Sequence, residues 1–116
     1  MEDVLKSSDF VTLHIPKTGE KAVIGAEEIG LMKTGAGIIN TARGGVIDED
    51  ALMFSLDKGK LSYAALDVFE NEPTPSMHLL MNHSISLTPH IGAATQEAQD
   101  RIGTELAEKI IAYFKK

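Results

Sequence analysis

Three side chains that could do chemistry stand in short motifs that each follow an apolar run. Arg43 lies in Asn-Thr-Ala-Arg-Gly-Gly, Glu72 in Glu-Asn-Glu-Pro, and His90 in Pro-His-Ile-Gly. An arginine can bind a carboxylate through two parallel hydrogen bonds, and a histidine paired with a carboxylate can move a proton near neutral pH. Together these side chains are equipment for an enzyme that oxidises a 2-hydroxy acid or reduces a 2-keto acid.

Each of these residues, taken alone, has a commoner and non-catalytic explanation. An arginine before two glycines is more often a solvated loop residue, a histidine after a proline usually stands in a turn, and a Glu-Pro pair usually lies in a loop. The three residues nevertheless follow consecutive predicted strands. Because the carboxyl ends of parallel strands meet at the edge where ligands bind, we expect Arg43, Glu72 and His90 to converge there.

The elements that must position these residues follow from the local patterns. Strands are predicted over residues 10–15, 37–42, 61–69 and 84–88, which are rich in β-branched or other apolar residues. Helices are predicted over residues 2–8 and 26–33, from the cap Asp48 to residue 58, and from the cap Thr95 onward. Residues 71–82 are predicted to be a loop. The alternation predicts an α/β fold with one parallel sheet in the order 1-2-3-4 and helices on both faces.

Composition restricts the function further. The 116 residues suffice for one domain, and a hydrophobic content of 43% suffices for one core. The formal net charge of −6 argues against nucleic acid or an anionic membrane as a partner. No apolar run reaches the roughly 18 residues of a membrane span, and the amino end does not resemble a signal peptide. Zero cysteines exclude disulfides and suit the cytoplasm, where we expect the protein.

Two common kinds of site are missing from the pattern. No predicted strand is followed by a G-x-G-x-x-G turn, so the usual pyrophosphate cradle of a dinucleotide enzyme is absent. The four histidines lack the spacing of metal ligands, so we expect no metal site. His14 is interpreted as a structural residue at a strand end, and His78 and His83 as surface residues.

The ordered set of motifs resembles the D-isomer-specific 2-hydroxyacid dehydrogenases. It includes residues 8–16, 40–45, 65–69, 72–73 and 89–92, so it covers essentially the whole chain. The resemblance implies a subunit in which a Rossmann domain is inserted into a substrate domain, and it identifies residues 1–116 as the second half of that Rossmann domain. The first half and the substrate domain have no counterpart here. We therefore expect a truncated product, natural or engineered, that begins inside a family element.

The resemblance also implies the roles of the catalytic residues. His90 would be the acid/base, Glu72 would orient its imidazole, and Arg43 would bind the substrate carboxylate. The parent enzyme would use NAD and a small 2-hydroxy or 2-keto acid. This fragment is expected to bind no cofactor and to be inactive alone.

The cofactor contacts implied by the resemblance lie around the same three motifs. Asp67 would accept a hydrogen bond from the nicotinamide carboxamide, although it could instead bind backbone amides as a strand-end carboxylate. Arg43 and His90 would also face the cofactor. The remaining contacts would be made by small or apolar residues, those on the nicotinamide side being Thr41, Ala42, Gly92 and Ala93 and those under the adenosine half being Ile15 and Pro16.

Two readings compete with an enzyme fragment. One is a stand-alone binding module of flavodoxin-like or receiver-like build, although residues 10–19 offer neither clustered acids nor a hydroxyl-rich phosphate loop. The other is a half-domain with a purely structural purpose. For any of these, residues 10–15 would form an apolar sheet edge, and the last helix would carry an apolar stripe that needs burial. We therefore expect a homodimer, formed by helix docking or by exchange of a terminal element.

Overall fold

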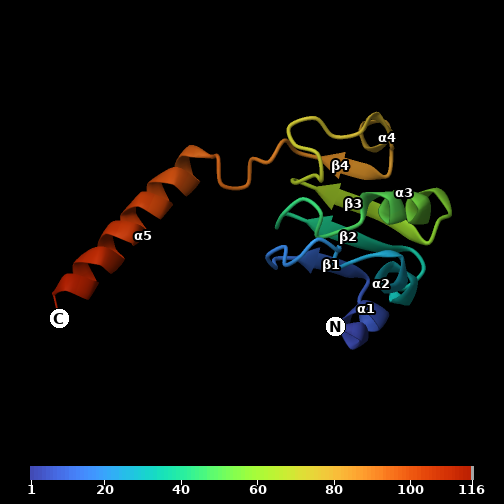
Figure 1. Cartoon of the computed structure of the whole chain (residues 1–116), viewed down its shortest axis with the longest axis horizontal. Coiled ribbons are helices and arrows are strands. Elements are labelled where there is room, and N and C mark those ends of the chain that lie inside the picture. The colour runs from blue at the N-terminus through green and yellow to red at the C-terminus, as the bar shows by residue number, and fades with distance from the viewer. Residues whose placement is uncertain (116) are drawn as a thin grey trace.

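The computed structural model describes residues 1–115 and contains one four-stranded parallel sheet (Figure 1). The strands are β1 (Phe10–Leu13), β2 (Ala36–Asn40), β3 (Leu61–Leu66) and β4 (Ile85–Leu87), and they stand in the order β1-β2-β3-β4. Each neighbouring pair is parallel. The predicted α/β class, the parallel pairing and the sequential order are confirmed.

Five helices accompany the sheet. They are α1 (Glu2–Ser7), α2 (Ala26–Leu31), α3 (Glu49–Asp57), α4 (Met77–Leu80) and α5 (Gln96–Phe114). The predicted caps are present, because the side chain of Asp48 accepts a hydrogen bond from the Ala51 amide at 2.9 Å and that of Thr95 accepts one from the Ala98 amide at 3.2 Å. Helix α4 falls inside the predicted loop over residues 71–82, which corrects that part of the prediction.

The core lies on one face of the sheet. Val11, Ile38 and Ala64 occupy one row across three strands and are buried. Helices α1, α2 and α3 pack in series, and α3 packs against β3. Burial of these side chains against the helices supplies the main hydrophobic stabilisation, at about 25 cal/mol per Å² of apolar surface.

The opposite face of the sheet is open in the described part of the chain. Phe10, Thr12, Tyr63 and Ser86 alternate with the buried residues and are exposed. The expectation of helices on both faces is therefore wrong. Right-handed connections that all step in the same direction along a sheet place their helices on the same face, and the connections between the four described strands all step in one direction.

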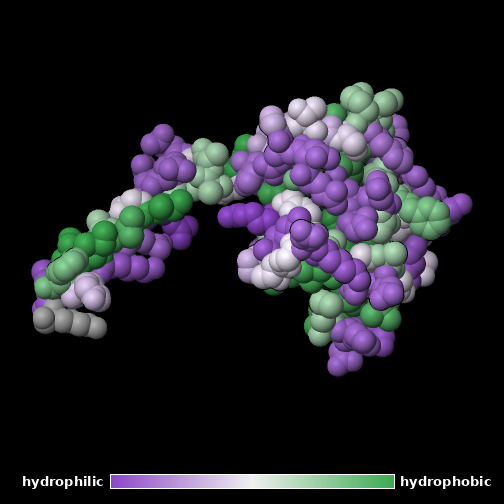
Figure 2. All heavy atoms as spheres, in the orientation of Figure 1, coloured by the Kyte–Doolittle hydropathy of each residue, from purple (hydrophilic) through white to green (hydrophobic). Residues whose placement is uncertain are grey.

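Helix α5 extends away from the rest of the molecule (Figure 1). Hydrophobic side chains gather along it (Figure 2), and none of its described residues is buried. The predicted apolar stripe is present but exposed to solvent, at Ile102, Leu106, Ile110 and Phe114. Between residues 1 and 115, no helix is long and apolar enough to cross a membrane.

Candidate active site

The last paired row at the carboxyl edge of the sheet contains one buried polar residue, Asn40. Asn40 on β2 pairs with Leu13 on one side and Leu66 on the other, and Asn40 is buried. Beyond this row the chain leaves the sheet in loops. These loops surround a cleft of about 840 Å³ lined by residues of the predicted site and by others, namely His14, Ile15, Pro16, Lys17, Thr41, Ala42, Arg43, Gly44, Phe69, Glu70, Glu72 and His90.

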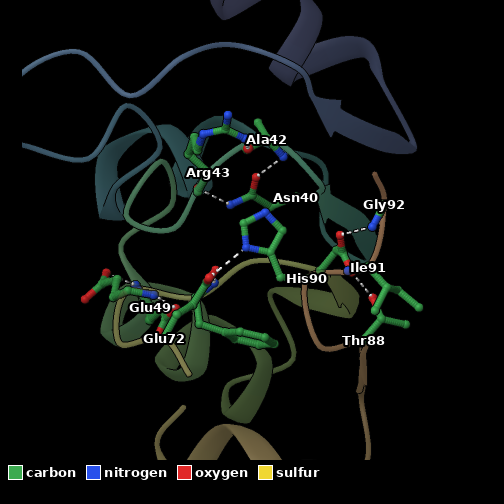
Figure 3. A network of polar contacts seen from close by, with 12 residues as sticks. Asn40, Ala42, Arg43, Glu49, Glu72, Thr88, His90, Ile91 and Gly92 are labelled. Carbon is green, nitrogen blue, oxygen red and sulfur yellow. Dashed lines mark hydrogen bonds and ion pairs between the residues drawn. The ribbon is translucent and has the colours of Figure 1, made fainter. Parts of the chain in front are cut away.

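Glu72 and His90 form a direct pair in this cleft (Figure 3). His90 Nδ1 lies 2.7 Å from Glu72 Oε2, and the Phe69 amide donates to Glu72 Oε1 at 3.1 Å. The hydrogen bond from His90, followed by that from Phe69, lowers the pKa of Glu72. Because an ionised carboxylate can only accept, this geometry favours the proton on Nδ1. The second ring nitrogen is then free to exchange a proton with a bound molecule.

The backbone of His90 is held in an uncommon conformation. Its φ of 56° makes it the only non-glycine residue with positive φ among those described. The His90 amide donates to the Thr88 carbonyl at 3.0 Å across Pro89. This tight turn directs the imidazole toward Glu72 and the loop that follows β2 (Figure 3).

The loop that carries Arg43 is built on Asn40. The Asn40 side chain accepts from the Ala42 amide at 3.0 Å and donates to the Arg43 carbonyl at 3.0 Å. The guanidinium of Arg43 donates to the Ala42 carbonyl at 2.7 Å and is exposed. Arg43 therefore lines the same cleft as His90, but its charged end is turned onto its own loop. The other four of its five N–H donors remain available to a carboxylate.

Asp67 ties the loop after β4 to the end of β3. Its carboxylate accepts from the Thr88 hydroxyl at 2.6 Å and from the amides of Ile91 and Gly92 at 2.9 and 3.0 Å. Burial acts to raise the pKa of Asp67, but the three hydrogen bonds together outweigh it and the pKa is lowered. The structure thus contains the backbone-amide contacts that were the alternative to a cofactor contact. A carboxylate has about four acceptor positions, so the two roles are compatible.

The predicted cofactor contacts divide into two groups. Ile15, Pro16, Thr41 and Ala42 line the main cleft together with Glu72 and His90. Gly92 and Ala93 lie outside it, in a smaller hollow formed with the start of α5. Seven of the ten predicted site residues thus share one cleft, and Asp67 contacts the second group through Gly92.

Sequence reasoning missed several residues of the cleft. Lys17 lies over Gly45, where an added Cβ would be 2.6 Å from Nζ. Gly44, Phe69 and Glu70 also line the cleft. For Gly44 the sequence signal was its place directly after Arg43. In the structure an added Cβ at Gly44 would lie 1.7 Å from the Phe69 carbonyl oxygen, and only glycine permits that approach.

The structure also places the other histidines named above. His14 lines the cleft and its Nε2 lies 3.0 Å from the Thr12 hydroxyl. His78 lies outside the cleft and pairs with Asp57 at 3.7 Å. No group of three or more potential metal ligands is found among residues 1–115.

A parallel α/β sheet with a polar cleft at its carboxyl edge is the architecture of Rossmann-type nucleotide-binding domains. The family model for "D-isomer specific 2-hydroxyacid dehydrogenase, NAD binding domain" matches residues 1–92. The chain therefore belongs to the D-isomer-specific 2-hydroxyacid dehydrogenases. The resemblance drawn from its motifs is confirmed.

Curated relatives agree with this assignment. D-3-phosphoglycerate dehydrogenase of Methanocaldococcus jannaschii is 50% identical over 111 residues, which cover 95% of this chain and 21% of that protein. Hydroxypyruvate reductase of Thermotoga maritima is 48% identical over 114 residues, which cover 95% of this chain and 37% of that protein. Several D-3-phosphoglycerate dehydrogenases are 43–50% identical to the chain.

Solved structures show the same fold. D-lactate dehydrogenase of Aquifex aeolicus, complexed with NAD and lactic acid, has a TM-score of 0.77 at 36% identity and is matched over 98% of this chain and 39% of that one. The NAD-binding 2-hydroxyacid dehydrogenase of Polaromonas has a TM-score of 0.85 at 36% identity, over 98% of this chain and 36% of that one. The chain spans about a fifth to two fifths of the length of these relatives.

Proposed function

We propose that this chain is the part of an NAD-dependent D-2-hydroxyacid dehydrogenase, of the D-3-phosphoglycerate dehydrogenase type, that carries the catalytic residues. The contact of 2.7 Å between His90 Nδ1 and Glu72 Oε2 is the observation that carries the proposal. A histidine fixed by a carboxylate at the carboxyl edge of a Rossmann-type sheet is suited to proton transfer to or from a small substrate.

The residues have distinct roles in this reaction. His90 accepts the hydroxyl proton at Nε2 when a 2-hydroxy acid is oxidised and returns it when a 2-keto acid is reduced. Glu72 holds the imidazole in the Nδ1–H tautomer and stabilises the positive charge that forms on it. Arg43 binds the substrate carboxylate and polarises the carbonyl oxygen, after its guanidinium leaves the Ala42 carbonyl.

The cleft offers contacts for both ends of a dinucleotide. NAD, when bound, supplies the carbon that accepts the hydride. The small residues Thr41 and Ala42 leave room for the nicotinamide beside His90, and the exposed surfaces of Ile15 and Pro16 suit the adenosine half. Asp67 has acceptor capacity left for the carboxamide.

We propose that the isolated chain does not turn over. It has no glycine-rich turn to hold the pyrophosphate at a helix N-terminus. Without that contact the reacting carbon of the cofactor is not positioned, and positioning can account for roughly 7–11 kcal/mol of a barrier. We therefore expect neither NAD binding nor oxidation of any D-2-hydroxy acid by the 116-residue chain alone.

A segment exchange tests the proposal. The matching 111 residues of the Methanocaldococcus jannaschii enzyme are replaced by those of this chain, and NADH formation is measured with D-3-phosphoglycerate, D-lactate and D-glycerate. We expect NAD-dependent oxidation by the chimera, with D-3-phosphoglycerate preferred, and none by the isolated chain. A chimera that folds and binds NAD but oxidises none of these acids would overturn the proposal, and turnover by the isolated chain would overturn its last part.

A further inference from the structure

Glu72 lies in an exposed loop, which raises the question of what keeps it beside His90. Residues 70–74 are all exposed. The last buried residue before them is Phe69, whose amide donates to Glu72 Oε1. The position of Glu72 thus depends on how firmly Phe69 and Glu70 are held.

Two glutamates tie this segment to the first turn of α3. The Glu49 amide donates to Glu70 Oε1 at 3.0 Å, and the Glu70 amide donates to Glu49 Oε1 at 2.6 Å. The arrangement is reciprocal, since each carboxylate accepts from the backbone of the other residue. It satisfies one of the free amides at the start of α3 and one amide of the loop.

The reciprocal contact stands next to a second tie. The Phe69 carbonyl lies against Gly44, where an added Cβ would be 1.7 Å from the oxygen. The loop after β3 is therefore held on one side by the Arg43–Gly44 loop and on the other by α3. Both ties lie within three residues of Glu72.

Two negative charges are brought together to make this contact. Burial, and secondarily the charges of Glu70 and Asp50, raise the pKa of Glu49. The carboxylates of Glu49 and Glu70 repel each other when both are charged. Their contact therefore depends on the backbone hydrogen bonds that each carboxylate accepts.

We propose that Glu49 and Glu70 are positioning residues, a reciprocal latch that holds Glu72 in register with His90. The inference rests on the proposed function, since it assigns to the latch the alignment of the acid/base pair. It acts through Phe69, whose amide contacts Glu72 and whose carbonyl contacts Gly44.

The His90 tautomer reports the latch directly in the 116-residue chain. Nitrogen NMR at a pH where imidazole is neutral distinguishes Nδ1–H from Nε2–H, and the hydrogen bond to Glu72 favours Nδ1–H. We expect Nδ1–H to dominate in the unsubstituted chain and to fall below half in Glu49→Ala and Glu70→Ala. Glu49→Gln and Glu70→Gln keep an acceptor oxygen for the same amides, so the Nδ1–H tautomer of His90 should still dominate in them.

Matched controls separate the latch from general stability. Asp50→Ala removes another carboxylate from the first turn of α3, and His83 provides an internal reference imidazole in every spectrum. Asp50→Ala should leave the His90 tautomer unchanged. If an alanine variant fails to fold, Glu49→Asp or Glu70→Asp, which keeps the charge but shortens the side chain by one methylene group, takes its place with the same expected loss.

The outcomes distinguish the latch from the proposed function. If Nδ1–H persists in folded Glu49→Ala and Glu70→Ala, the latch is overturned. This holds even if their free energy of unfolding falls, because a merely structural role would lower stability without changing the His90 tautomer. Absence of Nδ1–H from the unsubstituted chain would instead count against the Glu72–His90 pair itself.

Discussion

The Asp67 side chain joins the end of β3 to the loop that carries His90. We predict that Asp67→Asn lowers the free energy of unfolding by about 2–3 kcal/mol at pH 7, because an amide cannot accept all three hydrogen bonds and leaves donors unsatisfied. Urea denaturation measures this free energy. Asp50→Asn, at an exposed position, is the control and should change the free energy of unfolding by less than about 0.5 kcal/mol.

The effect of Asp67 has a defined pH dependence. Its pKa in the folded chain lies below the ordinary value of 3.8. A lowered pKa contributes stability above the unfolded-state pKa and loses it as the pH falls through the folded-state pKa. The difference between the unsubstituted chain and Asp67→Asn should therefore shrink below about pH 4. A difference that stayed constant from pH 7 to pH 3 would contradict the assignment of these hydrogen bonds to a charged carboxylate.

Arg43 is predicted to act in substrate capture. In the chimera, Arg43→Ala should raise the KM for the 2-hydroxy acid by roughly 10- to 150-fold, which corresponds to the loss of about 1.5–3 kcal/mol from hydrogen bonds to a charged group. Arg101→Ala, on the exposed helix α5, is the control and should leave KM unchanged. Steady-state kinetics check this, and an Arg43→Ala chimera with an unchanged KM would refute the role.

At the scale of elements, the close approach of two loops builds the cleft. Gly44→Ala should lower the free energy of unfolding by about 1–3 kcal/mol, because the new Cβ would overlap the Phe69 carbonyl. Gly30→Ala, in α2 where a Cβ meets nothing within 4 Å, should instead stabilise the chain by about 0.4–1 kcal/mol. Thermal or urea unfolding compares the two variants, and equal effects would show that the loops do not touch.

Local patterns were sufficient to predict most elements but not their ends. The strand predicted over residues 61–69 ends at Leu66. Beyond it the Asp67 amide still donates to the Asn40 carbonyl at 3.0 Å, while the Asp67 side chain binds the loop after β4. Helix α4 was missed since Met77-His78-Leu79-Leu80 is too short to show a helical period. The open face of the sheet was missed because a near-continuous apolar run, such as residues 37–42, is typical of a strand covered on both faces.

The candidate site was predicted in outline. Arg43, Glu72 and His90 could be brought together from sequence because parallel strands end at one edge. Two sets of hydrogen bonds were not predicted: the local ones by which Asn40 braces the Arg43 loop, and the Glu49–Glu70 latch over a separation of 21 residues. The latch depends on where the backbone amides of two distant segments point after folding, and no local sequence pattern indicates this.

At the scale of the whole molecule, two apolar surfaces lack a partner within the described chain. One is the open face of the sheet around Phe10 and Tyr63, and the other is the stripe on α5. Strand β1 is also an edge whose free backbone groups can pair with another chain. Burial of each large side chain of the stripe stabilises by roughly 1.5–3 kcal/mol. We therefore expect a homodimer in which α5 of each copy docks on the other.

Light scattering at micromolar concentration tests this expectation. The full chain should have twice its monomer mass of 12.5 kDa. A chain ending after Ala94, which lacks α5 but keeps the sheet, should have the mass of its own, smaller monomer. A full chain that scatters as a single species of 12.5 kDa would show that the expectation is wrong.

We proposed that His90, held by Glu72, transfers the proton, and the turnover number of a His90→Ala chimera measures that role. Loss of a general acid/base should lower kcat by about 100- to 10,000-fold. His78→Ala, which removes an exposed histidine outside the cleft, should leave kcat within about twofold of the unsubstituted chimera. A folded His90→Ala chimera that binds NAD and turns over as fast as the His78→Ala chimera would contradict the account.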